Sequence, residues 1–121
     1  KGAMYAGYQT LLESVGMGFG DLDRIILAGN FGAYIDLERA IRIGLLPDID
    51  RERYYYLGNA SLLGCQISLL DHRRFRERVE VRKLMTNIEL SENPDFMNHY
   101  VAALFLPHTD MSLFPSVKTK K

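Results

Sequence analysis

The sequence predicts an α/β fold in which a short, mostly parallel sheet is flanked by helices. Two short runs, residues 24–28 and 54–57, have the Ile, Leu and Tyr content of strands. Segments with helical spacing of apolar residues precede, separate and follow these runs. This alternation is typical of parallel strands joined by right-handed helical crossovers.

The composition indicates a single globular domain over residues 1–121. The chain has 121 residues, of which 47% are hydrophobic and 25% charged. Fifteen basic and fifteen acidic residues give a net charge of zero, so the sequence offers no bulk attraction to nucleic acid or to an acidic membrane. Its apolar runs are all shorter than the roughly 18 residues of a membrane span.

The single cysteine, Cys65, excludes an intrachain disulfide and an iron–sulfur site built from this chain's own thiols. Its position among apolar residues predicts a packed thiol, and this cysteine usage fits a reducing, cytoplasmic location. The first residues read as the middle of a helix, without a signal peptide, which suggests a piece of a longer protein.

The N-terminal half is predicted to run helix, strand, helix. Apolar residues recur at helical spacing over residues 3–15, and glycines at 16, 18 and 20 end that helix. Residues 24–28 suit a strand buried on both faces, followed by a turn over Gly29–Gly32. Asp36 is placed to cap the next helix, which Gly44 closes and Pro47 prevents from resuming.

The C-terminal half is predicted to continue strand, helix, helix, strand, helix. Gly58 and Asn59 lead from residues 54–57, where one or two of three tyrosines should be core, into a leucine-rich helix and then a charged one. Residues 86–90 are a further strand candidate. The last helix, predicted to extend to Pro107, should be capped by Asn93 with Pro94 in its first position and an apolar inner face. The apolar tail should dock on a surface, and residues 118–121 should be disordered.

Two glycine-containing turns follow strands of the predicted sheet, and ligands of open α/β sheets bind at that edge. Glycine accepts unusual backbone angles and lets the main chain approach a ligand closely. Two such turns, Gly29–Gly32 and Gly58 with Asn59, would form a shared crevice for a nucleotide. Spacing alone favours two tight connections over a nucleotide site, since Gly-Asn-Phe-Gly matches neither a P-loop nor a dinucleotide fingerprint.

Four stretches carry a resemblance to a known family: ILAGNFGAYIDLERAIRIGLLPDI, YYYLGNASLLG, IELSENPDFMNHYVAALFLPH and SLFPSV. They resemble, in order and at similar spacing, the C-terminal region of the reductive activators of corrinoid-dependent enzymes. Members of that family are iron–sulfur proteins that use ATP to drive reduction of a Co(II) corrinoid to Co(I), which restores a methyltransferase system. Their C-terminal half resembles the acetate-and-sugar-kinase, heat-shock-chaperone and actin (ASKHA) ATPases.

The resemblance implies a partial actin- or acetate-kinase-like (ribonuclease H-like) lobe. It places the superfamily's adenosine turn at Gly29, Asn30, Phe31 and Gly32, with Gly58 and Asn59 beside it. Asn30 stands where the superfamily usually has its second glycine, and asparagine tolerates positive φ better than most residues.

The resemblance also defines what other parts of the protein must supply. The phosphate-binding loops, the metal-binding Asp and the cysteine cluster have no counterpart in this sequence, so no catalytic or metal-ligating residue is assigned. ATP with Mg would bind in the full-length protein, and the iron–sulfur cluster would lie in an N-terminal domain absent from this chain. Expected partners are a corrinoid protein or corrinoid-dependent methyltransferase and the remainder of the same polypeptide, with homodimerisation through the exposed interface.

A basic stripe offers a second hypothesis. Arg74, Arg78 and Arg82 recur four residues apart on the charged helix. This pattern fits a solvated helix face, or a docking stripe for an acidic corrinoid protein or methyltransferase in a module without a nucleotide role. The three histidines, His72, His99 and His108, are too scattered to predict a metal site.

Overall fold

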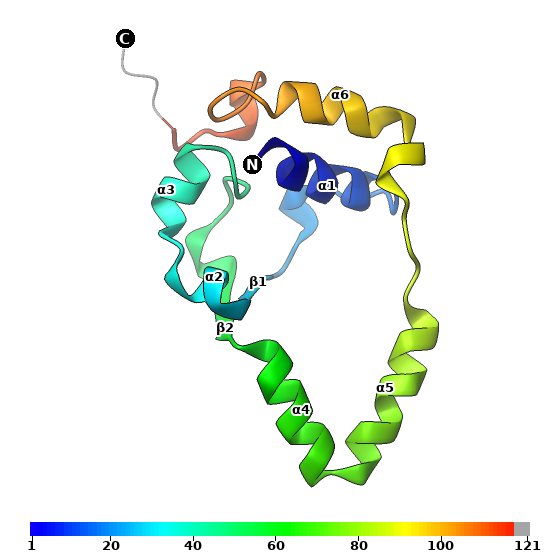
Figure 1. Ribbon diagram of the computed structural model, residues 1–121. Helices are drawn as coiled ribbons and strands as arrows, with labels where there is room; N and C mark the ends of the chain where they lie inside the picture. The colour runs from blue at the N-terminus through cyan, green and yellow to red at the C-terminus, as the bar shows by residue number, and fades with distance from the viewer. Residues whose placement is uncertain (118–121) are drawn as a thin grey trace.

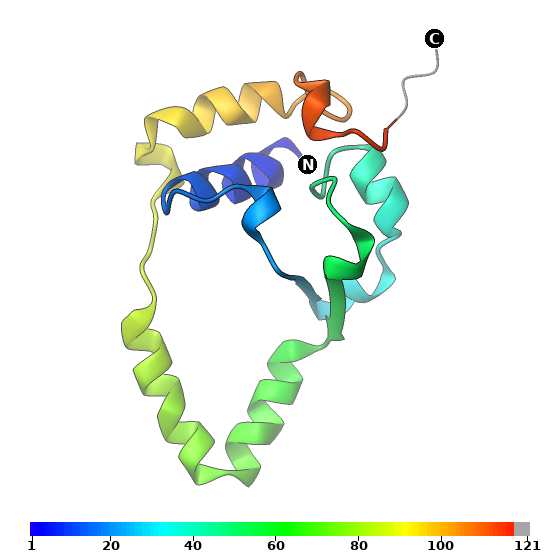
Figure 2. The ribbon, with the colours of Figure 1, turned by 180° about the vertical axis from the view of Figure 1, so that it is seen from behind.

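The computed structural model describes residues 1–117, apart from the side chain of Phe31. The predicted disorder of residues 118–121 therefore lies outside the described residues. Helices α1 and α6 lie side by side at one end, and α4 and α5 form a V at the other (Figures 1 and 2). The elements, in order, are α1 (Gly2–Glu13), η1 (Phe19–Asp21), β1 (Ile25–Ala28), α2 (Gly29–Tyr34), α3 (Leu37–Arg42), η2 (Arg51–Arg53), β2 (Tyr54–Gly58), α4 (Ala60–Leu70), α5 (His72–Leu84), η3 (Leu90–Glu92), α6 (Pro94–Ala102) and η4 (Met111–Leu113).

The sheet confirms the predicted α/β class with parallel strands. β1 and β2 pair in parallel, from Ile25 opposite Tyr54 to Ala28 opposite Gly58. In the described part of the chain this sheet has two strands, so the third strand predicted at residues 86–90 is wrong. That segment lies apart from β1 and β2 in both ribbon views, and an isolated extended segment has no ladder of hydrogen bonds to join (Figures 1 and 2).

Strand β1 is covered on one face, which corrects the expected burial on both. Ile25 and Leu27 pack against the core, whereas Ile26 is 60% exposed. Successive side chains of a strand point to opposite faces, so the open face is the one that carries Ile26. In β2, Tyr54 is buried while Tyr55 and Tyr56 are about half exposed, as the sequence predicted for one core tyrosine.

The predicted starts of α3 and α6 and the predicted end of α3 are confirmed by their capping contacts. The Asp36 carboxylate accepts a hydrogen bond from the Arg39 amide at 3.0 Å, and the Asn93 side chain accepts one from Asp95 at 2.9 Å. Gly44 ends α3 with φ +71°. α6 ends at Ala102, earlier than the predicted stop at Pro107.

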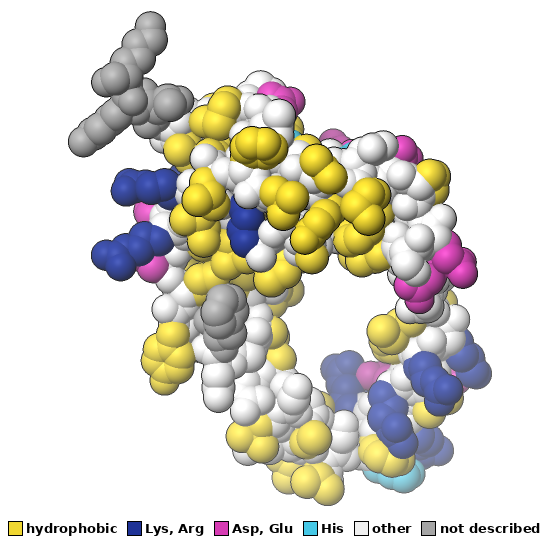
Figure 3. Space-filling view, turned by 45° about the horizontal axis from the view of Figure 1, so that its top comes forward, with side chains coloured by type: hydrophobic (Ala, Val, Ile, Leu, Met, Phe, Trp, Pro, Cys, Tyr) yellow, Lys and Arg dark blue, Asp and Glu magenta, His cyan; other side chains and the backbone are white. Residues whose placement is uncertain are grey.

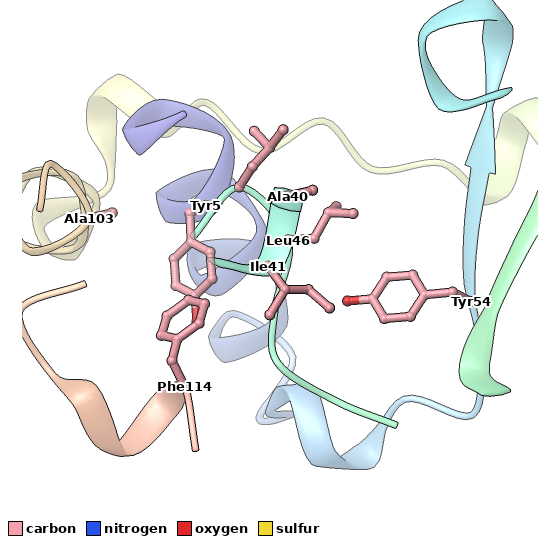
Figure 4. Close-up of a cluster of buried hydrophobic side chains, with 8 residues drawn as sticks. Tyr5, Ala40, Ile41, Leu46, Tyr54, Ala103 and Phe114 are labelled. Atoms are coloured by element: carbon pink, nitrogen blue, oxygen red, sulfur yellow. The ribbon is translucent and has the colours of Figure 1, made fainter. Parts of the chain in front are cut away.

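The core lies where α1, α3 and the C-terminal tail meet (Figure 4). The rings of Tyr5 and Phe114 lie 5.5 Å apart between centroids, which confirms that the apolar tail docks. The Tyr54 hydroxyl donates to the carbonyl of Pro47, so this core tyrosine leaves no unpaired hydroxyl. The buried hydrophobic residues of this cluster are Tyr5, Ala40, Ile41, Leu45, Leu46, Tyr54, Ala103 and Phe114.

Further predictions of burial are wrong. α4 contains no buried residue, and Cys65, expected to be packed, is exposed. The apolar face expected on α6 is also largely open, with Met97 61% and Val101 52% exposed. Helical spacing predicts which side chains share a face, but burial also requires an element opposite that face.

No helix in the described part of the chain is long and apolar enough to cross a membrane.

Polar contacts tie α1 to α6 and to the loop beyond it. The Lys1 ammonium donates to the carbonyl oxygens of Ala103, Phe105 and Pro107. At the other end of α1, Glu13 pairs with His99 of α6 at 2.8 Å. These contacts hold the N-terminal helix against the segment that leads into the tail.

His108 should make the stability of the protein pH-dependent. Its ring is 7% exposed, and Nδ1 accepts a hydrogen bond from the Asp110 amide at 3.0 Å, so the proton of the neutral ring is on Nε2. Burial lowers the pKa of His108 below its ordinary value, so the unfolded chain binds this proton more readily. The free energy of unfolding should therefore be level above about pH 7 and fall as pH drops below about 6.5.

Urea unfolding of wild type and His108→Gln between pH 5 and 8 measures this effect. The variant should lose the difference between pH 7.5 and pH 5.5, whereas His72→Gln, at an exposed helix start, should keep it. Equal pH slopes in wild type and His108→Gln would show that this ring does not cause the dependence.

Candidate functional site

The two predicted turns lie side by side. β1 and β2 are parallel and adjacent, so both carboxyl ends reach the same edge of the sheet, and Ala28 is the register partner of Gly58. The pairing is irregular between Leu27 and Ala28, where β1 leaves the ladder. Residues 29 and 58 therefore meet at this edge, although 28 residues of chain separate them.

The backbone has open space beside it at both bends, Gly29 and Gly58. Gly29 has φ +87° and Gly58 has φ +67°, and a β-carbon built on either would meet no atom within 4 Å. Positive φ is a conformation that side-chain-bearing residues rarely adopt, so both positions favour glycine for their backbone. The open space beside the two glycines does not follow from their backbone conformation. This space allows another molecule to approach their peptide groups.

The turn assigned to Gly29–Gly32 is shorter than predicted. The chain bends at Gly29 and enters α2 at once, so Asn30 and Gly32 are helical. Asn30 is exposed without the positive φ that its place after a glycine allowed, because Gly29 takes that conformation instead. For Phe31 the structure describes the helical backbone alone.

Gly32 has a packing role. A β-carbon there would lie 3.1 Å from the carbonyl carbon of Leu27 and 3.3 Å from its Cβ, so glycine lets α2 pack closely on β1. Gly32 also lines an apolar hollow of about 210 Å³ with Met4, Tyr8 and Ile26. The positive-φ geometry of the bend thus comes from Gly29, and its close packing on β1 from Gly32.

Asn59 is the N-cap of α4. Its side-chain oxygen accepts a hydrogen bond from the Leu62 amide at 3.0 Å. This cap starts a helix of 11 residues directly after the bend at Gly58. Asn59 therefore orients the chain that leaves the site, and its carboxamide oxygen is already engaged.

The sequence predicted an exposed apolar interface, but not the part that β1 contributes to it. The outer side of α1 and the open face of β1 form a groove of about 280 Å³, to which Tyr8, Leu11 and Ile26 contribute. Leu11, one of the apolar residues at helical spacing in α1, is 46% exposed. Tyr5 and Thr10 of the same helix are buried instead, and the spacing of apolar residues alone gave no signal for this.

The chemistry at this edge is suited to binding. Gly29, Gly58 and Asn59 offer peptide groups and a carboxamide, without an ionisable group. Among residues 1–117, no cluster of three or more His, Cys, Asp or Glu side chains could hold a metal ion.

Comparisons with known proteins agree on one family. A family model described as the C-terminal domain of RACo, the ASKHA domain, matches residues 1–118. A solved structure named "Reductive activator for corrinoid,iron-sulfur protein" is 46% identical, with a TM-score of 0.88 over 96% of this chain and 18% of that one.

Two sequence relatives carry related names. The corrinoid activation enzyme RamQ of Eubacterium limosum is 37% identical over 101 residues, 84% of this chain and 17% of RamQ. The [Co(II) methylated amine-specific corrinoid protein] reductase of Methanosarcina barkeri is 30% identical over 105 residues, 85% of this chain and 19% of the reductase. The chain thus spans less than a fifth of the length of these relatives.

Proposed function

Because the chain belongs to the family of C-terminal ASKHA domains of RACo, we propose that it forms the adenosine side of an ATP site in a reductive activator of a corrinoid protein. The names of the relatives support this proposal, since they describe activation or reduction of corrinoid proteins. The reaction of the whole protein would be one-electron reduction of Co(II) to Co(I). Its expected partner is a corrinoid protein, and a corrinoid-dependent methyltransferase is the alternative partner.

One observation carries the nucleotide assignment. Gly29 and Gly58, which both have positive φ and open space beside the backbone, meet at the carboxyl edge of a parallel sheet. Ligands of open α/β sheets bind at this edge, and a nucleoside can lie against main chain only where no side chain intervenes. The residues fit a nucleoside better than a phosphate, since α2 has only six residues and no basic side chain. ATP can move domains only through different affinities for two arrangements of them.

We further propose that this chain is the C-terminal part of a longer, cytoplasmic protein. Its share of its relatives' length supports this, as does the open apolar surface of α1 and β1. Mg and the iron–sulfur cluster would be held by other parts of the polypeptide, because a single cysteine cannot ligate such a cluster. An association of two copies through the same surface is a further expectation.

Bulky substitutions at the two open glycines test the site. In the full-length protein, Gly29→Val and Gly58→Val should each weaken ATP binding by about tenfold or more, because the new side chain fills the space that the nucleoside needs. Isothermal titration with ATP measures this, and the rate of Co(I) formation measures the consequence. Gly32→Val is unsuitable, since it would also push α2 away from Leu27.

Gly16→Val is the matched control. Gly16 has φ +70° and the same open surroundings, but it lies after α1, away from the sheet edge. This variant should keep the ATP affinity while suffering the same backbone strain. If all three variants bind ATP like wild type, the bends have no nucleotide role, and the docking function described from the basic stripe becomes the better candidate.

A further inference from the structure

The V formed by α4 and α5, residues 60–84, projects from the rest of the molecule, and we call it the α4–α5 arm. Its helices contact each other more than any other element, and neither contains a buried residue. Figure 3 shows an opening between the arm and the body that remains when side chains are drawn. A segment of this length that contributes so little to the described core must be explained by something outside that core.

The two helices of the arm differ sharply in charge. α4 has no charged residue and exposes its leucines. α5 has six basic and two acidic residues, a net charge of +4 within a chain whose total is zero. In Figure 3 the Lys and Arg side chains of this part gather over α5, next to the hydrophobic side chains of α4.

Part of the positive charge on α5 is unpaired. Glu77 lies 2.8 Å from Arg74, and Glu80 lies 2.9 Å from Lys83, so these cations are locally neutralised. Within residues 1–117, Arg78 and Arg82 have no ion-pair partner. They are four residues apart on one helix face, and Arg78 lies over the Phe75 ring at 4.0 Å from its centroid.

Apolar side chains stand beside this basic face. Leu69 and Leu70, at the end of α4, are 85% and 88% exposed, and Phe75 on the first turns of α5 is 42% exposed. An aromatic or aliphatic anchor flanked by arginine is the composition of protein–protein hot spots. The arm therefore presents an apolar tip and a basic side to the same partner.

The pattern favours a protein over a polyanion or a bilayer. The whole chain is neutral, which gives no long-range attraction to nucleic acid. The apolar residues of α5 are spread around the helix between charged ones, so it lacks the continuous apolar face of a membrane-surface helix. Arg78 and Arg82 are two of the three α5 arginines without an ion-pair partner among residues 1–117, and with the small apolar tip they match an acidic patch of a protein surface.

Resting on the proposed function, we propose that the α4–α5 arm docks on an acidic surface of the corrinoid protein, with Arg78 and Arg82 as its charged contacts and Leu69 and Leu70 as its apolar tip. Only the start of α4 adjoins the bend at Gly58, whereas Leu69, Leu70 and all of α5 follow 11 residues or more later in the chain. Docking through these residues would therefore leave nucleotide binding to the sheet-edge bends.

Charge reversal in the full-length protein tests this proposal against a Co(II) corrinoid iron–sulfur protein as the probe. Arg78→Glu/Arg82→Glu should raise the Kd by about tenfold or more at low salt, and the difference should shrink near 0.5 M salt, as expected for exposed charges. Arg78→Lys/Arg82→Lys should stay close to wild type. Arg39→Glu/Arg42→Glu on α3 makes the same change of charge elsewhere and should bind normally. Circular dichroism and Tm verify that each variant is folded.

The outcomes separate this proposal from the proposed function. ATP affinity should be equal in all these variants. If wild type binds the corrinoid protein and both reversal pairs bind it equally well, the arm is not the docking site, while the proposed function stands. If wild type does not bind it at all, the proposed function fails. Binding of phosphatidylserine vesicles or duplex DNA that is lost only in Arg78→Glu/Arg82→Glu, with unchanged corrinoid-protein binding, would assign the arm to another class of partner.

Discussion

Replacing Gly44 with alanine should destabilise the protein by roughly 3 kcal/mol, from strain and overpacking together. Gly44 ends α3 with φ +71°, and its amide donates to Ile41 at 2.8 Å while Leu45 donates to Ala40 at 2.8 Å, which is the Schellman arrangement. A β-carbon at Gly44 would lie 2.1 Å from the carbonyl oxygen of Pro107, so the loop after α6 would have to move.

Gly16→Ala separates the two causes. Gly16 has φ +70° but a β-carbon there would meet nothing within 4 Å, so this variant has the backbone strain without the collision and should lose only about 1 kcal/mol. Equilibrium unfolding in urea compares the two variants. Equal losses in both would mean that the loop at Pro107 adjusts freely and that the close contact at Gly44 has no energetic importance.

Arg51→Met should destabilise the protein by about 2–3 kcal/mol, because it leaves a buried carboxylate without its cation. The Arg51 guanidinium donates to both oxygens of Glu38 at 2.8 and 3.1 Å and to Asp48 at 2.6 Å. It also donates to the Ser116 hydroxyl at 2.9 Å, and Asp48 accepts the Ser116 amide at 2.7 Å. The side chain of Asp48 is only 2% exposed, so water cannot replace the lost partner.

The network joins α3, the segment before β2 and the C-terminal tail, and two variants define its nature. Arg39→Met removes a pair with Asp36 whose side chains are 84% and 52% exposed, so it should cost less than about 0.5 kcal/mol. Arg51→Lys keeps the charge but loses the several N–H donors of the planar guanidinium, so its loss of stability should lie between those of Arg39→Met and Arg51→Met. Hydrogen exchange of residues 111–117 should accelerate in Arg51→Met. If Arg51→Met proves as stable as Arg39→Met, the network does not hold the tail.

The same network should make the protein lose stability in acid. Burial acts to raise the pKa of Asp48, but the hydrogen bonds from Arg51 and Ser116 outweigh it, and the net pKa is lowered. A carboxyl with a lowered pKa contributes stability above the ordinary aspartate range, and this contribution is lost as pH falls below about 4. Asp48→Asn should therefore flatten the loss of unfolding free energy between pH 5 and pH 3.

Much of the local structure could be predicted from short stretches. Asp36, Gly44 and Asn93 mark helix ends because their side chains or backbone angles act within a few residues, and all three do so in the structure. The strand at residues 86–90 could not be excluded in this way. A strand exists only when another strand pairs with it, and no local pattern shows whether that neighbour is present.

The candidate site shows the same division. The sequence marked both glycine bends and, through resemblance, their family, but it placed the first bend over Gly29–Gly32 and suggested a positive φ for Asn30. The structure gives that conformation to Gly29 and makes Gly32 a packing residue. The distinction depends on how closely α2 lies against Leu27, which is a contact between elements.

By itself, the sequence determined the α/β class, the helix caps, the two strands and the residues of the basic stripe, because each depends on neighbours along the chain. Only the tertiary structure brought Gly58 beside Ala28, joined Arg51 to the tail and left the leucines of α4 exposed. Pairing and burial depend on which distant segment lies opposite a residue, and that is a property of the folded chain.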